Sequence, residues 1–292
     1  MSNTQAPDSA VAEPVRHLRP HEFEAIRKLA YEKFGLDLRR GKEQLVSARL
    51  GKRMRDGGFS SFEQYYQHVL GDPSGDAMIG MIDALATNHT SFLRETPHFD
   101  FLRQEVLPAL RARPRIDVWS AACSTGEEPY SLAFTLADQW GIEALRKVHI
   151  WATDISTKAL TAAKNAVYPT ERFSTVPPAW LRQYLLRGEG RWTGYYRIKP
   201  EVRSCVETGR LNLIEPLPPG NQFPLIFCRN VMIYFDKPTQ EGLVGRLASR
   251  LEPGGYLMIG HAESLTGVRH PLTYVRPAIY RKPGGVSGRG VK

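Results

Sequence analysis

The first hundred residues carry a helical pattern of apolar positions. In HEFEAIRKLAYEKFG (21–35) apolar residues recur at three- and four-residue spacing, and Gly35 offers a stop. The same pattern returns in three further stretches, at 43–58, 60–72 and 74–86. Ser60 with Glu63 three residues later predicts a capping box. The pattern therefore predicts a small helical bundle.

After Pro114 the pattern changes to strands alternating with helices. Runs rich in β-branched and aromatic residues lie at 115–122, 148–154, 225–235 and 256–264. Helix-like stretches lie between them at 129–140, 157–165 and 240–252. Ser156 is expected to cap the second of these helices, and a Pro-Gly-Gly turn is expected after the third. The alternation predicts βαβ units and a mainly parallel sheet, whose ligands lie at the carboxyl ends of the strands.

One stretch interrupts the alternation. Residues 192–207 are dense in aromatic and β-branched residues, with a Pro and a Gly, and predict a small antiparallel β subdomain inserted into the α/β domain. At the two ends, residues 1–15 are expected to form a disordered leader and 283–292 a flexible tail.

Composition narrows the class of protein. Of 292 residues, 42% are hydrophobic and 24% charged, which is ordinary for a globular chain. The net charge of +9 suggests an anionic partner. No apolar run is long enough for a transmembrane helix, and the N-terminus does not resemble a secretory signal. Three cysteines without CxxC spacing favour neither disulfides nor a metal site, so a reducing cytoplasm is expected.

A loop of small residues follows the first strand. Its sequence, AACSTGEEPYS (121–131), lacks the Gly-Lys-Ser/Thr of a triphosphate loop, and Gly126 is its one glycine, so it is no dinucleotide loop either. Glu127 and Glu128 stand where a pyrophosphate would meet the helix N-terminus. Carboxylates there would repel a phosphate and suit a cationic ligand. The alternative is that both acids only complement the helix dipole.

Asp154 ends the second strand. An acid at this place commonly accepts hydrogen bonds from the ribose of a nucleoside cofactor. The alternative is that Asp154 only helps Ser156 to cap the next helix. Together with the loop, this favours a nucleoside cofactor that is cationic and is not a phosphate. S-adenosylmethionine, with its adenosine, sulfonium and amino-acid end, fits that description.

Five segments carry a family resemblance that covers about residues 20–282. They are TNHTSFLRE (87–95), WSAACSTGEEPYS (119–131), ATDIS (152–156), LNLIE (211–215) and FCRNVMIYFDKPTQE (227–241). They resemble the signature segments of the bacterial chemotaxis receptor methyltransferases, which methylate glutamate side chains on chemoreceptors. The resemblance implies a class I methyltransferase fold, doubly wound, with a helical receptor-docking domain at 16–90 and the methyltransferase domain at 91–282. It also implies S-adenosylhomocysteine as product and glutamate methyl esters in chemotaxis signalling and adaptation.

The resemblance implies cofactor contacts for ten residues: Asn88, Thr90, Arg94, Ala121, Glu127, Asp154, Asn212, Leu213, Arg229 and Asn230. The first three would close over the cofactor from the linker after the helical domain. Ala121 and Glu127 would meet the methionine part, with Glu127 balancing its ammonium group. Asp154 would hold the ribose, and the Asn212-Leu213 pair would line the adenine. Arg229 and Asn230 would lie by the transferring methyl group.

Two residues are implied as catalytic. Arg94 would pair with the methionyl carboxylate or orient the substrate carboxylate, for which its planar fork is suited. Tyr234 would pack near the substrate side chain. The alternatives are a surface arginine and a core tyrosine. His89 matches no role and is expected at the surface, and Cys123 is expected to be an inert small residue.

Most of the basic surplus lies in one segment. Residues 39–55 hold seven basic residues and one acid, a net +6. The residues predicted to dock on a receptor are Lys42, Arg49, Lys52, Arg53 and Arg55. They lie beside an apolar stripe of Val46, Leu50 and Met54. The resemblance implies that this helix meets the acidic helical bundle of chemoreceptors, whereas the alternative is a solvated cationic face.

Further partners are less determined. In some relatives the inserted β subdomain captures a receptor C-terminal peptide by strand addition, and Trp192, Gly194 and Tyr195 are compatible with that. We expect a monomer without nucleic-acid or membrane partners and without a metal. Arg229-Asn230-Val231-Met232 replaces the NPPY-type motif of amino-group methyltransferases, which argues against DNA adenine methylation. The competing functions are methyl transfer to RNA or a small molecule, and a non-catalytic signalling scaffold.

Overall fold

The computed structural model describes residues 18–85 and 89–284. These residues form two compact units. The helical unit contains the described residues up to Glu32 and from Leu38 to Leu85, and the α/β unit contains Lys33–Asp37 and the described residues from His89 onward. The α/β unit therefore includes a short piece of the chain that the sequence placed in the helical domain. The predicted leader and most of the predicted tail lie outside the described residues.

The helical unit is built from the four predicted helices. They are α1 (Pro20–Phe34), α2 (Glu43–Asp56), α3 (Phe62–Gly71) and α4 (Asp76–Leu85). The stripe on α2 is confirmed, because Val46, Leu50 and Met54 are all buried. Gly35 follows α1 with a φ of +70°, as expected of a helix stop.

The predicted cap of α3 was wrong by one residue. Ser61, not Ser60, is the N-cap, and its side chain accepts a hydrogen bond from the Gln64 N–H at 3.2 Å. Gln64 Oε1 in turn accepts from the Ser60 N–H and the Ser60 hydroxyl. Ser61 thus caps the helix, but the reciprocal bond of a capping box is replaced by contacts from Gln64 to Ser60, the residue before the cap.

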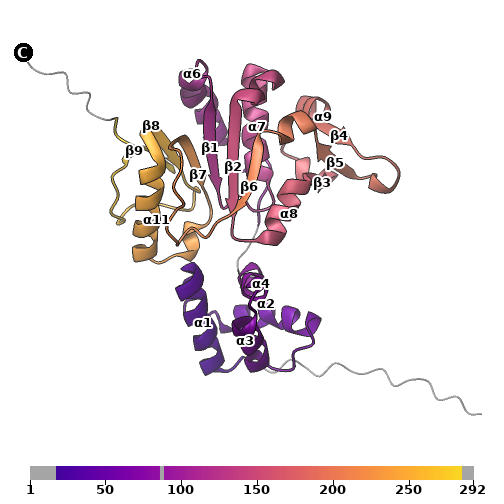
Figure 1. The fold of residues 1–292 in the computed structure, drawn as a ribbon, viewed down its shortest axis with the longest axis vertical. Coiled ribbons are helices and arrows are strands. Elements are labelled where there is room, and N and C mark those ends of the chain that lie inside the picture. The colour runs from indigo at the N-terminus through magenta and orange to yellow at the C-terminus, as the bar shows by residue number, and fades with distance from the viewer. Residues whose placement is uncertain (1–17, 86–88, 285–292) are drawn as a thin grey trace, which may run out of the picture. The chain divides into compact units, whose positions relative to one another are not determined.

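The α/β unit is organised around a seven-stranded sheet of order β6-β2-β1-β7-β8-β10-β9 (Figure 1). Its strands are β1 (Ile116–Ala121), β2 (Val148–Asp154), β6 (Val206–Arg210), β7 (Phe223–Cys228), β8 (Leu251–Met258), β9 (Thr273–Arg276) and β10 (Ile279–Arg281). The neighbours from β6 to β8 pair in parallel, whereas β10 runs antiparallel to both β8 and β9. The predicted mainly parallel sheet is confirmed.

Two hydrophobic cores cover the two faces of the sheet. Along β1 the residues alternate: Ile116 and Val118 belong to the larger core, and Trp119 and Ala121 belong to the other. Helix α7 (Glu127–Trp140) supplies buried residues to the larger core, and α11 (Lys237–Arg250) supplies them to the second. Both faces are therefore closed, and ligands must bind at an edge of the sheet.

Shorter helical elements complete the unit. The α-helices are α5 (Thr96–Phe101), α6 (Leu107–Leu110), α8 (Thr157–Asn165), α9 (Pro178–Tyr184) and α10 (Pro200–Arg203). A π-helical turn, η1 (Leu102–Val106), joins α5 to α6. The 3₁₀ turns are η2 (Ile142–Lys147), η3 (Thr170–Phe173), η4 (Gly190–Trp192) and η5 (Met232–Tyr234). Ser156 caps α8 as predicted, accepting from the Ala159 N–H at 3.1 Å.

The inserted antiparallel subdomain has other boundaries than predicted. It is a three-stranded sheet, β3-β5-β4, formed by β3 (Val167–Pro169), β4 (Leu185–Arg187) and β5 (Tyr195–Ile198). The last part of the predicted stretch, 206–207, belongs instead to β6, which pairs in parallel with β2. Only β5 of this small sheet lies within 192–207, because its two partners come from earlier in the chain.

Three other predictions need correction. The Pro-Gly-Gly expected as a turn lies inside β8, where the pairing with β7 shifts register and Gly254 has a φ of +80°. The strand expected over 225–235 ends at Cys228 and is followed by η5. The strand expected over 256–264 ends at Met258. Within the described ranges, no helix is both long and apolar enough to span a bilayer, and all three cysteines are buried and unpaired.

Candidate active site

The loop from β1 to α7 is held in an unusual backbone conformation. Ala122, Ser124 and Gly126 have φ values of 63°, 50° and 100°. A Cβ on Gly126 would lie 2.7 Å from the Tyr168 hydroxyl oxygen and 2.9 Å from the Ala163 Cα. The one glycine of the loop is therefore required by both its φ and its surroundings. Left-handed non-glycine residues of this kind concentrate at binding sites, where the surrounding structure stabilises them.

Replacing Gly126 by alanine should destabilise the chain and weaken cofactor binding. Backbone strain alone costs about 1–3 kcal/mol, and the contact with the Ala163 backbone adds to it. Gly141→Ala is the matched control, because Gly141 also has a positive φ (+86°) but nothing lies within 4 Å of its added Cβ. Denaturant unfolding and cofactor titration of both variants are the measurements. Equal losses in the two variants would contradict the close-approach argument.

Asp154 joins the loop to the start of α8. Its Oδ2 accepts the Ser124 N–H at 2.8 Å, and its Oδ1 accepts the Ser156 N–H at 2.9 Å. The capping contact that was the alternative role is thus present. A carboxylate oxygen accepts more than one hydrogen bond, so these contacts are compatible with ribose binding as well.

Glu127 begins α7 and is almost fully buried. Its Oε2 accepts the Thr125 hydroxyl at 2.6 Å. Its Oε1 has no hydrogen-bond partner among the described residues, although Arg172 Nη1 lies 3.4 Å away. Leaving a buried carboxylate oxygen without a hydrogen bond is costly. This oxygen therefore fits a ligand that brings a cationic donor, such as the ammonium group of an amino acid.

Arg172 is a residue that the sequence did not single out. It lies in η3, and its Nη1 also donates to the Thr90 carbonyl oxygen at 3.0 Å. It therefore joins Glu127 to the segment that carries Thr90, which is itself buried. Nothing in the local sequence TERF marks this role. Asn88 lies outside the described residues.

A buried charge cluster lies at the end of β7. The Arg229 side chain is 2% exposed; its Nη1 donates to Glu128 Oε2 at 3.0 Å and its Nη2 to Glu95 Oε2 at 2.9 Å. Glu128 also accepts the Ser120 hydroxyl at 2.7 Å. Burial raises the pKa of Glu128 despite the neighbouring guanidinium. Both Nη atoms of Arg229 are thus occupied by protein carboxylates, whereas its buried Nε has no hydrogen-bond partner among the described residues.

Glu95 connects this cluster to the next residues along the chain. Its Oε1 accepts from Asn230 Nδ2 at 3.2 Å, and Arg229 Nη2 also donates to the Arg94 carbonyl oxygen. Burial acts to raise the pKa of Glu95, but Arg229 and the hydrogen bonds outweigh it and hold that pKa below its usual value. Glu95 therefore holds the Asn230 side chain directly, and Arg229, the cation paired with Glu95, holds the Arg94 carbonyl oxygen.

Asn230 has a left-handed backbone, with a φ of 59°. Its N–H donates to Glu263 Oε2 at 3.0 Å, and the same oxygen accepts the Gly260 N–H at 2.6 Å. A Cβ on Gly260 would lie 2.4 Å from Asn230 Nδ2. Burial raises the pKa of Glu263, which collects backbone donors from both loops. Glu263 was not among the predicted site residues, and its only signal in the sequence was its place near the end of the strand predicted over 256–264.

Arg94 lies between two left-handed residues, Leu93 and Glu95, with φ values of 52° and 60°. Its side chain is partly exposed, and Nη1 donates to the His89 carbonyl oxygen at 2.7 Å. A guanidinium has five N–H donors, so this group can bind a carboxylate too. The expectation that His89 is exposed is confirmed.

The residues predicted at the adenine have structural contacts of their own. Asn212 Nδ2 donates to the Lys33 carbonyl oxygen and to Glu215 Oε1, both at 2.9 Å. Leu213 is buried, and its carbonyl oxygen accepts from Arg246 Nη2 at 2.7 Å. An adenine bound here would contact a segment that these hydrogen bonds already hold in place.

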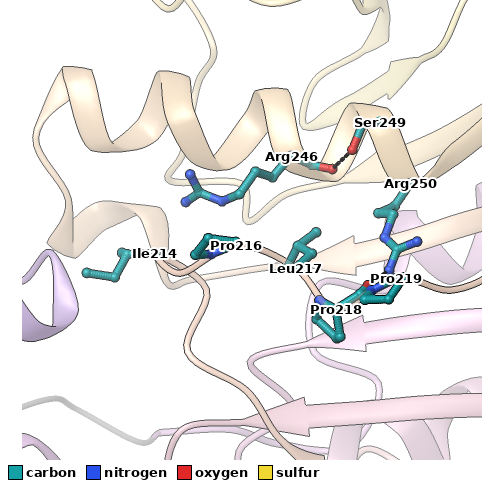
Figure 2. A pocket seen from close by; sticks show the side chains of 8 residues that line it. All are labelled: Ile214, Pro216, Leu217, Pro218, Pro219, Arg246, Ser249 and Arg250. Atoms are coloured by element: carbon teal, nitrogen blue, oxygen red, sulfur yellow. Dashed lines mark hydrogen bonds between the residues drawn. The ribbon is translucent and has the colours of Figure 1, made fainter.

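A surface pocket of about 550 Å³ lies behind that segment, between the 214–219 loop and α11 (Figure 2). Its lining residues are Ile214, Pro216, Leu217, Pro218, Pro219, Arg246, Ser249 and Arg250. Figure 2 shows both arginines on α11 beside the loop, and Arg250 donates to the Pro218 and Gly220 carbonyls. The pocket contains none of the predicted cofactor residues. Of its two arginines, Arg250 donates to the loop that follows the adenine segment, and Arg246 donates to Leu213 within that segment.

Tyr234 is half-buried in η5. Its carbonyl oxygen accepts the Asp37 N–H at 2.8 Å, and the next residue, Phe235, pairs with Leu36 across an isolated bridge. The backbone around the predicted catalytic tyrosine is thus fixed by the 33–37 segment of the same unit.

The predicted site residues follow adjacent parallel strands. Ala121 ends β1, Asp154 ends β2, Asn212 follows β6 and Arg229 follows β7. In the sheet β6, β2, β1 and β7 are consecutive neighbours, and Ala121 is in register with Thr153 and Cys228. Their carboxyl ends therefore form one edge, which is where α/β sheets bind ligands.

The residues predicted to dock on a receptor, at and along α2, differ in their surroundings. Lys42 precedes the helix as its N-cap residue, and Lys42, Lys52, Arg53 and Arg55 are exposed. Arg49 is half-buried and donates to the Leu85 carbonyl oxygen. Arg53 lies over Gly80, where an added Cβ would overlap its Nη2. Arg49 and Arg53 therefore also support the packing of the helical unit.

The β subdomain exposes aromatic side chains near the predicted peptide site. Trp192 is 50% exposed and lies edge-to-face with Tyr195, with ring centroids 6.0 Å apart. However, Tyr195 belongs to β5, the central strand, which pairs on both sides. Strand addition would therefore require the outer edge of β3 or β4.

Comparison with known proteins gives the family. Residues 88–280 match the model "CheR methyltransferase, SAM binding domain", and residues 21–86 match "CheR methyltransferase, all-alpha domain". Chemotaxis protein methyltransferase 2 of Pseudomonas aeruginosa is 37% identical, covering 95% of this chain and 98% of that protein. The chemotaxis protein methyltransferase of Klebsiella aerogenes is 40% identical over 88% of each chain. That of Borreliella burgdorferi is 36% identical over 89% of this chain and 94% of the relative. The chain therefore belongs to the CheR family of chemotaxis methyltransferases, and its cofactor is S-adenosylmethionine.

Proposed function

We propose that this chain transfers a methyl group from S-adenosylmethionine to glutamate side chains of chemoreceptors and so forms glutamate methyl esters. The observation that carries the proposal is the buried Glu127 Oε1, which has no hydrogen-bond partner among the described residues. An ammonium group would satisfy it. A nucleoside with an amino-acid end would then extend from this oxygen toward Asp154, which is joined to the same loop through Ser124.

The remaining cofactor contacts are proposed along the same edge. Thr90 and Arg94 would cover the cofactor, Ala121 would border its methionine part, and the Asn212-Leu213 pair would border the adenine. Asn230 would lie by the methyl group. Ala121, the Asn212-Leu213 pair and Asn230 are supported by their positions at or after the ends of neighbouring parallel strands. Further support comes from two contacts: Arg229 donates to the Arg94 carbonyl oxygen, and Asn230 donates to Glu95.

The cofactor, when bound, supplies an electrophilic methyl group on a sulfonium. The substrate glutamate is ionised at neutral pH, since the pKa of an ordinary glutamate side chain is about 4.3. The chain therefore needs no general base. Its residues bind and orient the two reactants and exclude water. Arg94 would hold a carboxylate of the cofactor or of the substrate, and Tyr234 would pack against the substrate side chain.

The decisive experiment measures transfer of radiolabelled methyl groups to a receptor fragment, to RNA and to a blank without acceptor. Base-labile label on the receptor fragment is expected, because methyl esters hydrolyse in base. Label on RNA would favour the alternative function of a nucleic-acid methyltransferase. Absence of label on any acceptor, with S-adenosylmethionine bound, would favour a non-catalytic scaffold.

The exposed cations of α2 are proposed to dock on an acidic receptor surface. Lys52→Glu with Arg55→Glu should slow receptor methylation by about tenfold or more at low salt, because steering depends on charge. These two positions are preferable to Arg49 and Arg53, which also support the helical unit. Initial rates against receptor concentration at several salt concentrations measure the effect.

A matched control for this reversal is Arg111→Glu with Arg146→Glu, two exposed arginines in the α/β unit. Both double variants change the net charge by the same amount. Cofactor affinity should be unchanged in the α2 variant. Equal slowing by both pairs would point to net charge rather than to a docking surface.

A receptor C-terminal peptide is proposed to bind, where a receptor carries one, at an outer edge of the three-stranded sheet. The support is geometric: β3 and β4 are the edge strands, and Leu186 on β4 and Trp192 nearby along the chain are large exposed apolar residues.

A further inference from the structure

Three potential metal ligands meet beside the charge cluster. One ligand atom from each of Glu95, His98 and His261 can be chosen so that all three lie within 4.8 Å of one another. Glu95 Oε2 and His98 Nδ1 are 3.5 Å apart, and the two imidazole rings have centroids 4.7 Å apart. Two ligands at zinc-like bond lengths of about 2.1 Å lie about 3.4 Å apart in a tetrahedron. The Glu95–His98 pair already has that separation.

His98 supplies an independent sign of a missing partner. Its side chain is fully buried, and neither ring nitrogen has a hydrogen-bond partner among the described residues. A neutral imidazole keeps a nitrogen lone pair, which is the form that binds metals. A metal ion would therefore supply the partner that the buried His98 ring lacks.

The net charge around the three ligands is compatible with a bound cation. Arg229 lies beside Glu95, but its other terminal nitrogen is paired with Glu128 at 3.0 Å. The two carboxylates and one guanidinium leave one net negative charge. His261 is exposed and Glu95 is partly exposed, whereas His98 is buried. The three ligands thus lead from the surface inward, and the exposed His261 can rotate to complete the coordination.

We propose that Glu95, His98 and His261 form a binding site for one divalent transition-metal ion, with Zn²⁺ as the best match to two imidazoles and a carboxylate, and that its occupancy inhibits methyl transfer. Two imidazoles and a carboxylate with an open fourth position are a known ligand set for zinc. The cysteine spacing that argued against a metal in the sequence does not bear on this cluster, which contains no cysteine.

Inhibition follows from charge and from shared ligands. A bound Zn²⁺ would compete with Arg229 and Asn230 for Glu95, and both contacts position the proposed methyl-transfer site. It would also place two positive charges near a cofactor that carries a net +1, whereas the product S-adenosylhomocysteine is neutral overall. Occupancy should therefore weaken binding of the cofactor more than binding of the product. This consequence rests on the proposed function; the metal site itself does not.

Calorimetric titration of the tag-free full-length chain with ZnCl₂, in a non-chelating buffer, tests the site. One Zn²⁺ per chain is expected, with affinity at least about tenfold weaker in His98→Gln and in His261→Gln. The exposed histidines of the helical unit provide the controls His21→Gln and His68→Gln, which should bind as the parent does. His261→Gln keeps the test valid if His98→Gln does not fold. Absence of binding, or equal affinity in all variants, would overturn the site.

The inhibition is tested on the same preparations. With Zn²⁺ bound, the Kd for S-adenosylmethionine should rise at least threefold and that for S-adenosylhomocysteine less than twofold, and EDTA should reverse both. His261→Gln should remove this difference. Zn²⁺ binding without any change in cofactor affinity would overturn the inhibitory role. Methyl transfer measured in EDTA tests the proposed function separately, because it requires no metal.

Discussion

Replacement of Arg229 by methionine should lower the free energy of unfolding by about 3–5 kcal/mol near neutral pH. The guanidinium is buried between Glu128 and Glu95, so an apolar side chain leaves both carboxylates without their cation. Burial already raises the pKa of Glu128 in the native protein, and loss of Arg229 raises it further. Denaturant unfolding of the parent and the variant measures the difference.

The loss depends on pH in a defined direction. In the variant the folded-state pKa of Glu128 exceeds the unfolded value, so the penalty is complete above the folded pKa and disappears below the unfolded one. The native contribution of Glu95, whose pKa is lowered, is likewise lost as pH falls. The stability difference should therefore be smaller at about pH 5 than at about pH 7.

Two variants check the cause. Adding Glu128→Gln to Arg229→Met should restore about 1–3 kcal/mol, because the buried charge is removed. Arg115→Met removes an arginine that is 63% exposed and pairs with Asp117, and should cost only about 0–1 kcal/mol. A similar loss at Arg115, or a loss at Arg229 that does not vary with pH, would refute the buried-cluster explanation.

Replacement of Arg94 by alanine should lower kcat by about 100- to 1000-fold, the usual effect of removing a donor that acts in the transition state. If the guanidinium binds the methionyl carboxylate, affinity for S-adenosylmethionine should fall as well. A charge-assisted hydrogen bond of about 1.5–3 kcal/mol corresponds to roughly 10- to 100-fold. Cofactor titration and single-turnover methyl transfer measure the two effects separately.

The pattern of results assigns the role of Arg94. A fall in kcat with unchanged cofactor affinity indicates contact with the substrate carboxylate, and a fall in both indicates the cofactor carboxylate. Arg94→Lys should recover only part of the activity, because lysine lacks the planar fork. Arg146→Ala, at a highly exposed arginine, is the control. Near-normal values for Arg94→Ala would remove this residue from the active site.

Much of the fold follows from local sequence patterns. The apolar stripe of α2 and the strand over 148–154 lie where the sequence pattern predicted them. In each, the apolar positions follow one period only, that of a helix in α2 and that of a strand in β2. The wrong predictions concern places where short-range signals compete: Ser60 and Ser61 are both capable caps, and in the structure Ser61 accepts the Gln64 N–H. The glycines after Pro253 are typical of a turn, yet they lie in β8, where the Gly254 N–H donates to the Lys282 carbonyl oxygen and the Lys282 N–H donates to the Gly255 carbonyl oxygen.

The residues of the candidate site also divide into those that the sequence predicted and those that only the structure revealed. The residues that follow the strands, such as Asp154 and Arg229, lie in recognisable segments, and the order of parallel strands brings their ends together. Arg172 and Glu263 were missed because their partners are far away in the chain: Arg172 reaches Thr90 and Glu127, and Glu263 reaches Asn230. Their own neighbours along the sequence carry no sign of these contacts.

By itself, the sequence determined the class of fold, the family and the place of the cofactor loop, because periodicity, a single glycine and contiguous motifs are local properties of the chain. Only the tertiary structure decided that Arg229 is buried between two carboxylates, that Glu127 keeps an oxygen without a hydrogen bond, and that Glu95 and His98 meet His261. These are contacts between segments far apart in sequence, and their burial and charge balance exist only once the sheet has brought the segments together.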